Sequence, residues 1–356
     1  MIPRFGLSCS NELTDEVIRT AVVADELLFD HLWIADHSQY DVFSILTFLA
    51  SKTQRIKLCS GVTSPYTRHP VILAAGIATV NEISGGRGVL GLGAGGRRAL
   101  GHQLFTPRNQ LLHTREAIEV MKSVLAGNAV KYKGKTVEVK SYLSHIKMKN
   151  APIYLAAAGP KMLRLAGEMT DGVIINGLGA WPPAMKGFLK HVEEGTERAG
   201  RELKELDVVC WTRIAMAEEP ESLKEMLRPA IGLNIAVQPI DALKEKYGIE
   251  PEVANQIKEK FEEIILKWDP LKAPKAQAKA IEELVPDYML RRYALFGTPE
   301  QVVKRIKELM EAGVTQIALR NWPGVDPRSS DRPEDISSLR MRTLKTFGEQ
   351  VIPAFR

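Results

Sequence analysis

The sequence alternates short apolar runs with longer stretches of helical periodicity, and this alternation is the feature that most constrains the fold. Eight runs rich in Val, Ile and Leu are typical of buried strands. They are Arg4–Ser8, His31–Ala35, Ile56–Val62, Gly88–Gly93, Pro152–Ala156, Gly172–Asn176, Asp207–Ala215 and Thr315–Leu319. Helices are predicted at Thr14–Leu28, Val42–Lys52, Pro70–Ile83, Thr114–Leu125, Pro160–Met169, Pro183–Ala199 and Pro299–Ala312. Because parallel strands need crossover helices, the pattern predicts an α/β fold, a (β/α)8 TIM barrel with insertions.

A doubly wound sheet is the alternative for such a pattern. A glycine-rich fingerprint would then follow the first strand, and Ser8-Cys-Ser-Asn-Glu-Leu has none. Two stretches, 94–151 and 218–296, exceed a minimal barrel. We therefore expect one barrel domain over residues 1–356 with a helical insertion at about 218–296. Such an insertion builds either part of a substrate pocket or a peripheral helical layer, and the sequence leaves both open.

The composition argues against several classes of function. The 48 basic and 43 acidic residues give a net charge of only +5, and both signs are interspersed, so nucleic acid is not an expected partner. No apolar run reaches the roughly 18 residues that a membrane span needs, and no signal peptide is recognisable. Cys9, Cys59 and Cys210 stand far apart without metal-binding spacing, which predicts buried thiols, no metal and a cytoplasmic protein.

The third predicted strand ends in an unusual way. Its last residues run into Gly61, and Pro65 follows four residues later. A glycine within a strand pattern usually marks a bulge or a place where something approaches the backbone closely. The segment therefore indicates a bulge, or a contact with a ligand, at the end of this strand.

Polar or glycine-rich residues follow several predicted strands, and the carboxyl ends of the strands form the active site in barrels of this kind. These segments are Asp36-His37, Gly61–His69, Gly93–Arg98, Ala158–Lys161 and Asn176–Gly179. Asp36 and His37 could transfer a proton or anchor a polar group, but the pattern alone favours a helix-capping aspartate and a hydrogen-bonded loop histidine. The glycines around Gly93 could simply leave room for a neighbouring loop.

The turn Ala158-Gly-Pro-Lys-Met162 leads into a predicted helix. Unpaired N–H groups and the positive end of the helix dipole favour an anion there. Pro160 suits the first helical position, and Lys161 adds positive charge. The turn therefore predicts a phosphate site, although ordinary strand–helix connections also use Gly and Pro.

Three segments carry a family likeness: Trp33–His37, Gly61–Pro70 and Glu82–Gly95. They resemble the bacterial-luciferase-like superfamily, in its deazaflavin-dependent branch, and among its members the methylenetetrahydromethanopterin reductases. The blocks Pro152–Met162, Ala166–Asn176 and Phe296–Ile317 are similar to the same reductases. The likeness covers nearly the whole chain in order and is weakest across Glu218–Leu295 and after Arg320.

The resemblance implies a (β/α)8 barrel, a homodimer or higher homo-oligomer, and hydride transfer between coenzyme F420 and a small organic substrate. It also implies a bulge with a non-proline cis peptide at Gly61–Val62 that backs the coenzyme ring, with Asp36 and His37 as catalytic residues beside it. The implied cofactor-binding residues are Asp36, Gly61, Val62, Thr63, Gly93, Ala94, Gly95, Ala158, Gly159, Pro160, Lys161, Met162 and Asn176.

Two departures from the family pattern leave the substrate open. Ser8 stands where the reductases carry a Glu at the end of the first strand, and Gly96 stands where other relatives carry a Glu. Arg97 and Arg98 could contact an anionic substrate or the acidic tail of the coenzyme, or be solvated. The alternative functions are an FMN-dependent monooxygenase of the same superfamily and a non-catalytic flavin-binding protein.

Overall fold

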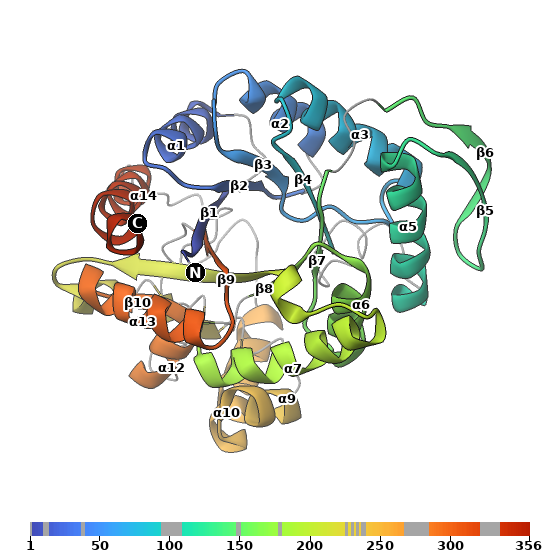
Figure 1. Cartoon of the computed structure of the whole chain (residues 1–356). Helices are drawn as coiled ribbons and strands as arrows, with labels where there is room; N and C mark the ends of the chain where they lie inside the picture. Colours follow the sequence, from blue (N-terminus) through green and yellow to red (C-terminus); the bar gives the residue numbers. More distant parts are fainter. Residues whose placement is uncertain are drawn as a thin grey trace. The chain divides into compact units, whose positions relative to one another are not determined.

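The fold is seen in a computed structural model of the whole chain (Figure 1). The structure describes residues 2–9, 14–36, 40–93, 109–146, 151–176, 180–224, 227–228, 231–232, 235, 240–266, 285–320 and 335–356. The chain forms two compact units. The larger comprises Arg4–Ile175 and Phe188–Val209, and the smaller comprises Met1–Pro3, Asn176–Gly187 and Cys210–Arg356. The expectation of a single domain over residues 1–356 stays a prediction.

A parallel sheet forms the centre of the larger unit. Its strands are β1 (Arg4–Cys9), β2 (His31–Ile34), β3 (Lys57–Ser60), β4 (Gly88–Leu92), β7 (Ile153–Ala156) and β8 (Gly172–Asn176). They are neighbours in that order, all parallel. Most of their residues are buried on both faces, as parallel strands covered by helices require. Their carboxyl ends therefore lie along one edge of the sheet.

Helices connect these strands and lie outside them (Figure 1). They are α1 (Asp15–Glu26), α2 (Val42–Ala50), α3 (Pro70–Ile83), α5 (Gln110–Leu125) and α6 (Pro160–Met169). Helix α7 (Pro182–Arg198) follows β8. Side-chain caps begin three of them: Thr14 accepts from the Val17 N–H, Asp41 from the Ser44 N–H, and His69 Nδ1 from the Val71 N–H. Polar residues directly before the apolar faces thus fix where these helices begin.

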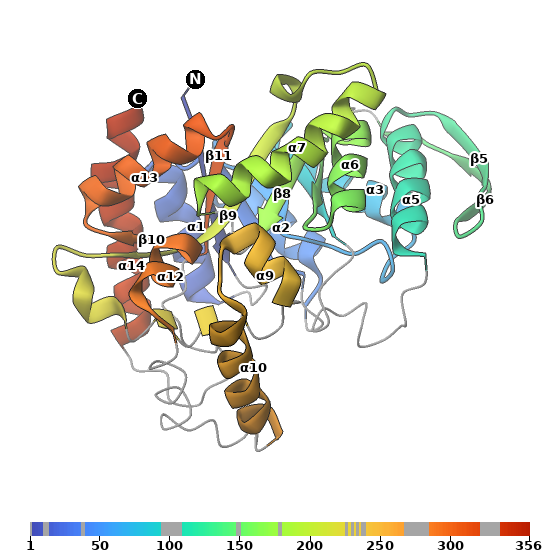
Figure 2. The same cartoon turned by 90° about the horizontal axis from the view of Figure 1, so that it is seen from below.

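The smaller unit contains β9, which runs from Asp207 to Met216 and starts in the larger unit, followed by β10 (Ala294–Gly297) and β11 (Gln316–Arg320). Both β10 and β11 are hydrogen-bonded neighbours of β9. The helices of this unit are α9 (Ile240–Tyr247), α10 (Pro251–Leu266), α12 (Asp287–Tyr293), α13 (Pro299–Glu311) and α14 (Asp335–Thr346). Figure 2 shows α9 and α10, which contact each other, within the segment predicted as an insertion.

The predicted fold class is confirmed. The chain is an α/β protein with a (β/α)8 barrel fold, whose eight strands are β1 to β4, β7 to β9 and β11. Helix α13 begins with a capping box, in which the Thr298 hydroxyl oxygen accepts from the Gln301 N–H and the Thr298 N–H donates to Gln301 Oε1. The third strand ends at Ser60, before Gly61, and is therefore shorter than predicted. Strand β10 was not predicted, because its four residues follow a helical pattern without a turn signal.

A polar network fixes the amino-terminal edge of the sheet in the larger unit. Asp207 accepts hydrogen bonds from the Arg4 guanidinium at 2.6 Å and from the Tyr154 hydroxyl at 2.7 Å. The Tyr154 ring lies 5.7 Å from the ring of Trp33, which is fully buried. Burial and the Asp207 carboxylate raise the pKa of Tyr154, so its proton stays available for the bond. This edge serves stability, as expected for the face opposite the active site of a barrel.

Candidate cofactor-binding site

Asp36 lies two residues after the end of β2, and its side chain is only 4% exposed. Its Oδ2 atom accepts a hydrogen bond from the Thr63 hydroxyl at 2.6 Å and another from the Arg68 guanidinium. A second Arg68 nitrogen lies 3.3 Å from Oδ1. The Asp36 carboxylate is thus held by an ion pair and a hydroxyl, which orients it rigidly.

Arg68 links this carboxylate to two further groups. It donates to Thr63 Oγ1 at 3.1 Å and to Asp41 Oδ1 at 3.2 Å, and its guanidinium carbon lies 5.7 Å from the centre of the Phe43 ring. Burial lowers the pKa of Arg68, but hydrogen bonds and the charges of Asp36 and Asp41 outweigh it and raise the pKa. Arg68 therefore stays charged at the ends of β2 and β3.

The bulge predicted after β3 is present, with a cis peptide between Gly61 and Val62. The Gly61 N–H donates to the Ile34 carbonyl at 2.7 Å, which ties the bulge to the end of β2. On the other side, the Thr63 N–H donates to the Gly91 carbonyl at 2.9 Å, and the Gly93 N–H donates back to the Thr63 carbonyl at 2.9 Å. The bulge thus lies between β2 and β4 and is bonded to both.

Gly91 in β4 and Gly93, the residue directly after β4, make room for β3 and this bulge. A Cβ atom on Gly91 would lie 2.1 Å from the Ser60 carbonyl oxygen, and one on Gly93 would lie 2.6 Å from Val62 Cγ2. Neither distance is compatible with van der Waals packing. The structure therefore shows that Gly93 accommodates a neighbouring loop, as one reading of the sequence proposed. Its role in binding a cofactor stays a prediction.

Replacing Gly93 by Ala should destabilise the protein by about 1–3 kcal/mol, the usual cost of overpacking. Val62 cannot easily move away, because a β-branched side chain has few allowed rotamers. Urea unfolding measures the change. Gly187→Ala is the matched control: an added Cβ there meets nothing within 4 Å, and the residue lies within α7. This control should be neutral or stabilising, by up to about 1 kcal/mol. Equal effects of the two substitutions would contradict the steric argument.

Tyr66 lies in the same loop and was not predicted as a site residue. Its ring stacks on that of His113, with 4.5 Å between the centroids. Its hydroxyl is buried, and no described residue forms a hydrogen bond with it. Burial raises the pKa of Tyr66 to about 12. A neutral hydroxyl without a partner can donate to a bound ligand.

The turn before α6 has the open backbone that an anion site needs. Residues Ala158–Lys161 are exposed, and no side chain caps the helix at Gly159. A Cβ atom on Gly159 would meet nothing within 4 Å. Pro160 is at the first helical position as predicted, and Met162 donates its N–H to the Gly159 carbonyl at 3.1 Å. These features fit a phosphate group at the amino terminus of α6.

Not all predicted site residues can be placed. Asp36, Gly61, Val62, Thr63 and Gly93 come together at the ends of β2, β3 and β4. Asn176 is the last residue of β8. His37, Ala94 and Gly95 lie outside the described residues, as do Arg97 and Arg98.

Comparisons with known proteins agree with this arrangement. Residues 4–316 match the family model described as luciferase-like monooxygenase. The 5,10-methylenetetrahydromethanopterin reductase of Archaeoglobus fulgidus is 32% identical over 335 residues, with 94% of each chain covered. The same enzyme of Methanolobus tindarius is 35% identical, over 85% of this chain and 89% of the relative. The coenzyme F420 dependent tetrahydromethanopterin reductase of Methanopyrus kandleri has a similar structure, with a TM-score of 0.83, 29% identity and 100% of both chains covered.

The chain belongs to the luciferase-like monooxygenase family. It is an oxidoreductase of that family. Arg68 and Tyr66 lie inside one of the family segments recognised in the sequence, but neither was predicted as a site residue. The available signal was positional: Arg68 and Tyr66 follow β3, Asp36 follows the neighbouring strand β2, and side chains at the carboxyl ends of adjacent parallel strands lie close together.

Ser8 is the point at which this member of the luciferase-like family departs from the reductase pattern. It lies in β1 opposite Trp33 and is only 9% exposed. Glu12, which could supply the missing carboxylate, lies outside the described residues. Among the described residues no three His, Cys, Asp or Glu side chains are grouped as metal ligands, and none of the described helices is long and apolar enough to cross a bilayer.

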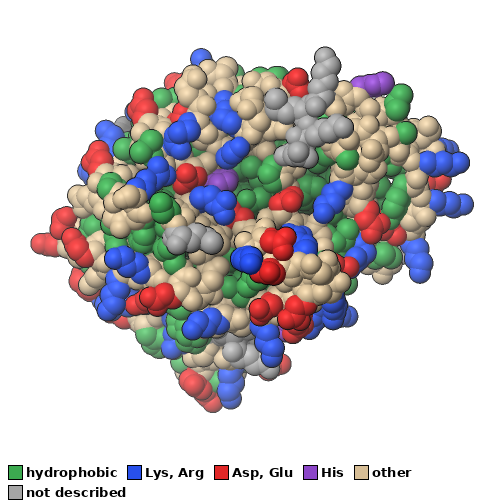
Figure 3. Space-filling view, in the orientation of Figure 1, with side chains coloured by type: hydrophobic (Ala, Val, Ile, Leu, Met, Phe, Trp, Pro, Cys, Tyr) green, Lys and Arg blue, Asp and Glu red, His purple; other side chains and the backbone are tan. Residues whose placement is uncertain are grey.

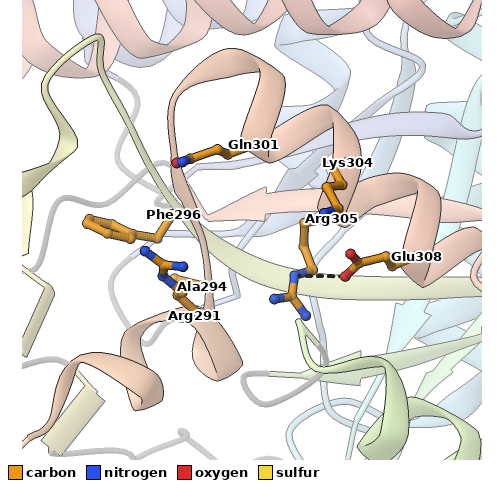
Figure 4. Close-up of a pocket in the computed structure, with 7 residues that line it drawn as sticks. All are labelled: Arg291, Ala294, Phe296, Gln301, Lys304, Arg305 and Glu308. Carbon is orange, nitrogen blue, oxygen red and sulfur yellow. Dashed lines mark ion pairs between the residues drawn. The ribbon is translucent and has the colours of Figure 1, made fainter.

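Two surface features contain none of the predicted site residues. The hairpin of β5 (Ala129–Lys133) and β6 (Glu138–Leu143) carries exposed lysines at 131, 133, 135 and 140. Blue Lys and Arg side chains are seen at the right of Figure 3, the side on which this hairpin lies in Figure 1. In the smaller unit, a hollow of about 220 Å³ lies beside α13 (Figure 4). Arg291, Lys304 and Arg305 line it, and Arg305 pairs with Glu308 at 3.4 Å. No residue predicted to bind the cofactor lines this hollow.

Proposed function

We propose that the protein is a coenzyme F420-dependent oxidoreductase that transfers a hydride between the coenzyme and a small organic substrate, in the manner of a methylenetetrahydromethanopterin reductase. The observation that carries the proposal is the ordered cluster of Asp36, Thr63 and Arg68, in a chain more than 30% identical to such reductases over 94% of its length. A cytoplasmic location and a homodimer belong to the same proposal.

The residues present fit the coenzyme. The open turn at Gly159 would hold its phosphate, and the bulge from Gly61 to Thr63 would support one face of its ring. The buried Tyr66 hydroxyl, which no described residue satisfies, offers a hydrogen bond. When bound, the deazaflavin supplies hydride transfer.

The protein side chains would position the reactants. Both Asp36 oxygens already accept hydrogen bonds from Thr63 and Arg68, so this carboxylate acts as an acceptor that orients a bound group, and it is not the proton donor. Tyr66, with its proton retained by burial, is the described residue suited to donate a hydrogen bond to substrate or coenzyme. His37 remains the other candidate for proton transfer, as the family resemblance implies.

A binding titration tests this function. Purified apoprotein is titrated in parallel with oxidised F420 and with FMN, following absorbance and fluorescence. We expect F420 to bind at least about tenfold more tightly than FMN, a difference of roughly 1.4 kcal/mol. Lys161→Met should weaken F420 binding, because it removes a charge at the proposed phosphate turn.

Three other outcomes of this titration would each favour a different conclusion. Selective binding of FMN would contradict the proposal and support the monooxygenase, for which oxygen uptake is the next measurement. Tight F420 binding without bleaching of the coenzyme by any reductant or pterin would support a non-catalytic binding protein. If neither compound binds, the assignment of the bulge and the turn to a cofactor is wrong.

A further inference from the structure

Two arginines of the smaller unit lie on neighbouring strands. Arg213 is the seventh of ten residues in β9, and Arg320 is the last residue of β11. The two strands are hydrogen-bonded neighbours. They are the seventh and eighth strands of the barrel, and in both the arginine lies in the carboxyl-terminal half. Both side chains are partly buried.

Neither guanidinium has a partner among the residues that the structure describes: no carboxylate is within ion-pair distance and no hydrogen bond is formed. Other partly buried arginines of the protein do have such partners. Arg68 and Arg115 each pair with a carboxylate, and Arg87 donates to four backbone carbonyls. Burial lowers the pKa of Arg213 to about 9, and repulsion from the nearby Arg320 cation contributes to this shift.

Another polar group on β11 is also unsatisfied. Gln316 is fully buried, and neither its amide nitrogen nor its oxygen has a partner among the described residues. Because side chains alternate along a strand, Gln316, Ala318 and Arg320 share one face of β11. On this face, a cation and an amide have no partner within the described part of the chain, and only the small Ala318 lies between them.

Two like charges withdrawn from water are costly without a counterion, and the described residues supply none to Arg213 and Arg320, so a bound anion would stabilise this arrangement. We propose that Arg213 and Arg320 together bind an anionic group, a phosphate or a carboxylate, of a ligand. Guanidinium groups recognise both anions through paired N–H donors. The ends of the seventh and eighth strands are also a frequent location for phosphate sites in barrels. The inference does not depend on the proposed F420 chemistry.

Inorganic phosphate is the first probe. The thermal midpoint of the full-length protein is measured in sodium phosphate and in sodium chloride of equal ionic strength. We expect phosphate to raise the midpoint of the wild type, and this rise to fall by at least about half in Arg213→Met and in Arg320→Met. The control Arg305→Met, on the surface hollow of Figure 4, should keep the full rise.

A second readout separates an anion site from a structural role. In chloride, each Met variant should be as stable as the wild type or more stable, because one of two repelling charges is gone. If a Met variant does not fold, Arg213→Lys and Arg320→Lys keep the charge but lose the paired donors, and they should bind phosphate more weakly. No phosphate effect in the wild type, or a full effect in both variants, would overturn the proposal.

Titration with F420 then identifies the source of the anion. If the acidic tail of the coenzyme occupies the site, its Kd should rise about tenfold or more in Arg213→Met, as expected for a lost charged hydrogen bond. If the anion belongs to the substrate, the Kd for F420 should stay within about twofold while the KM for an anionic substrate rises. Failure of F420 to bind at all would contradict the proposed function and leave the phosphate result standing.

Discussion

Replacing Arg68 by Met is expected to destabilise the protein by about 3–5 kcal/mol, the usual cost of removing one partner of a buried ion pair. Asp36 is 4% exposed and Arg68 20% exposed, so water cannot replace the lost guanidinium. Asp41 and the Thr63 hydroxyl lose a donor in the same change. The free energy of unfolding in urea, measured at pH 7, tests this expectation.

A double-mutant cycle shows whether the effect comes from the pair itself. Asp36→Asn combined with Arg68→Met should cost less than the sum of the two single changes, because the double variant leaves no unpaired buried charge. Arg305→Met is the control, since Arg305 forms an i,i+3 pair with Glu308 on a helix surface and should contribute at most about 1 kcal/mol. Additive single effects would contradict the proposed coupling.

The Arg68→Met variant also tests whether this cluster contributes to coenzyme binding. If Asp36 orients the bound ring as proposed, Arg68→Met should also weaken F420 binding by about tenfold or more, because the carboxylate and the bulge lose a common anchor. Unchanged F420 affinity in a folded Arg68→Met protein would limit Arg68 to a structural role.

The second large effect concerns Glu116 on α5, which holds the turn of the β5–β6 hairpin. Its carboxylate accepts the N–H groups of Lys135, Thr136 and Val137 at 2.8–2.9 Å and the Thr136 hydroxyl at 2.6 Å. Burial alone would raise its pKa, but these four donors outweigh burial and lower the pKa from 4.5 to about 2. Gly134 allows this approach, since a Cβ there would lie 2.5 Å from the carboxylate.

Glu116→Gln should therefore cost about 3 kcal/mol at pH 7, which corresponds to the lowered pKa. The folded pKa lies below the unfolded one, so the stabilisation is complete above pH 4.5 and is lost as the pH falls toward 2. Urea unfolding at pH 7 and at pH 3 should show the difference between wild type and variant shrinking at the lower pH. Glu119→Gln keeps an oxygen that can accept from the Tyr132 hydroxyl and loses only the charge, so it should cost at most about 1 kcal/mol. A pH-independent cost for Glu116→Gln would contradict the assignment.

Most elements of the fold could be predicted because their signals are local. The bounds of β8, α3 and α6 agree with the pattern, and those of the other barrel strands differ by a residue or two. The exception is β3, where glycine and the following bulge end the pairing at Ser60. The family segments also placed the cis peptide correctly, since the resemblance implied it at Gly61–Val62.

The candidate site was predictable only in part. The sequence identified the segments that follow the strands, because barrel sites lie there whatever the chemistry. It did not identify the Asp36–Arg68 pair, whose members are 32 residues apart, and it gave Tyr66 no role. Side-chain pairing depends on which strand ends become neighbours and on which rotamers the packing allows.

The sequence alone thus determined the strand–helix order, the helix starts near Thr14, Pro70 and Pro299, and the Gly-Pro turn before α6. These features arise from hydrophobic periodicity and from capping within a few residues. The tertiary structure alone decided that Asp36 is an ion-paired acceptor and that Gly93 makes room for Val62. It also decided that Arg213 and Arg320 come close to each other and find no partner among the described residues. Those facts depend on burial and on distances between residues far apart in the chain, and neither is encoded in any local pattern.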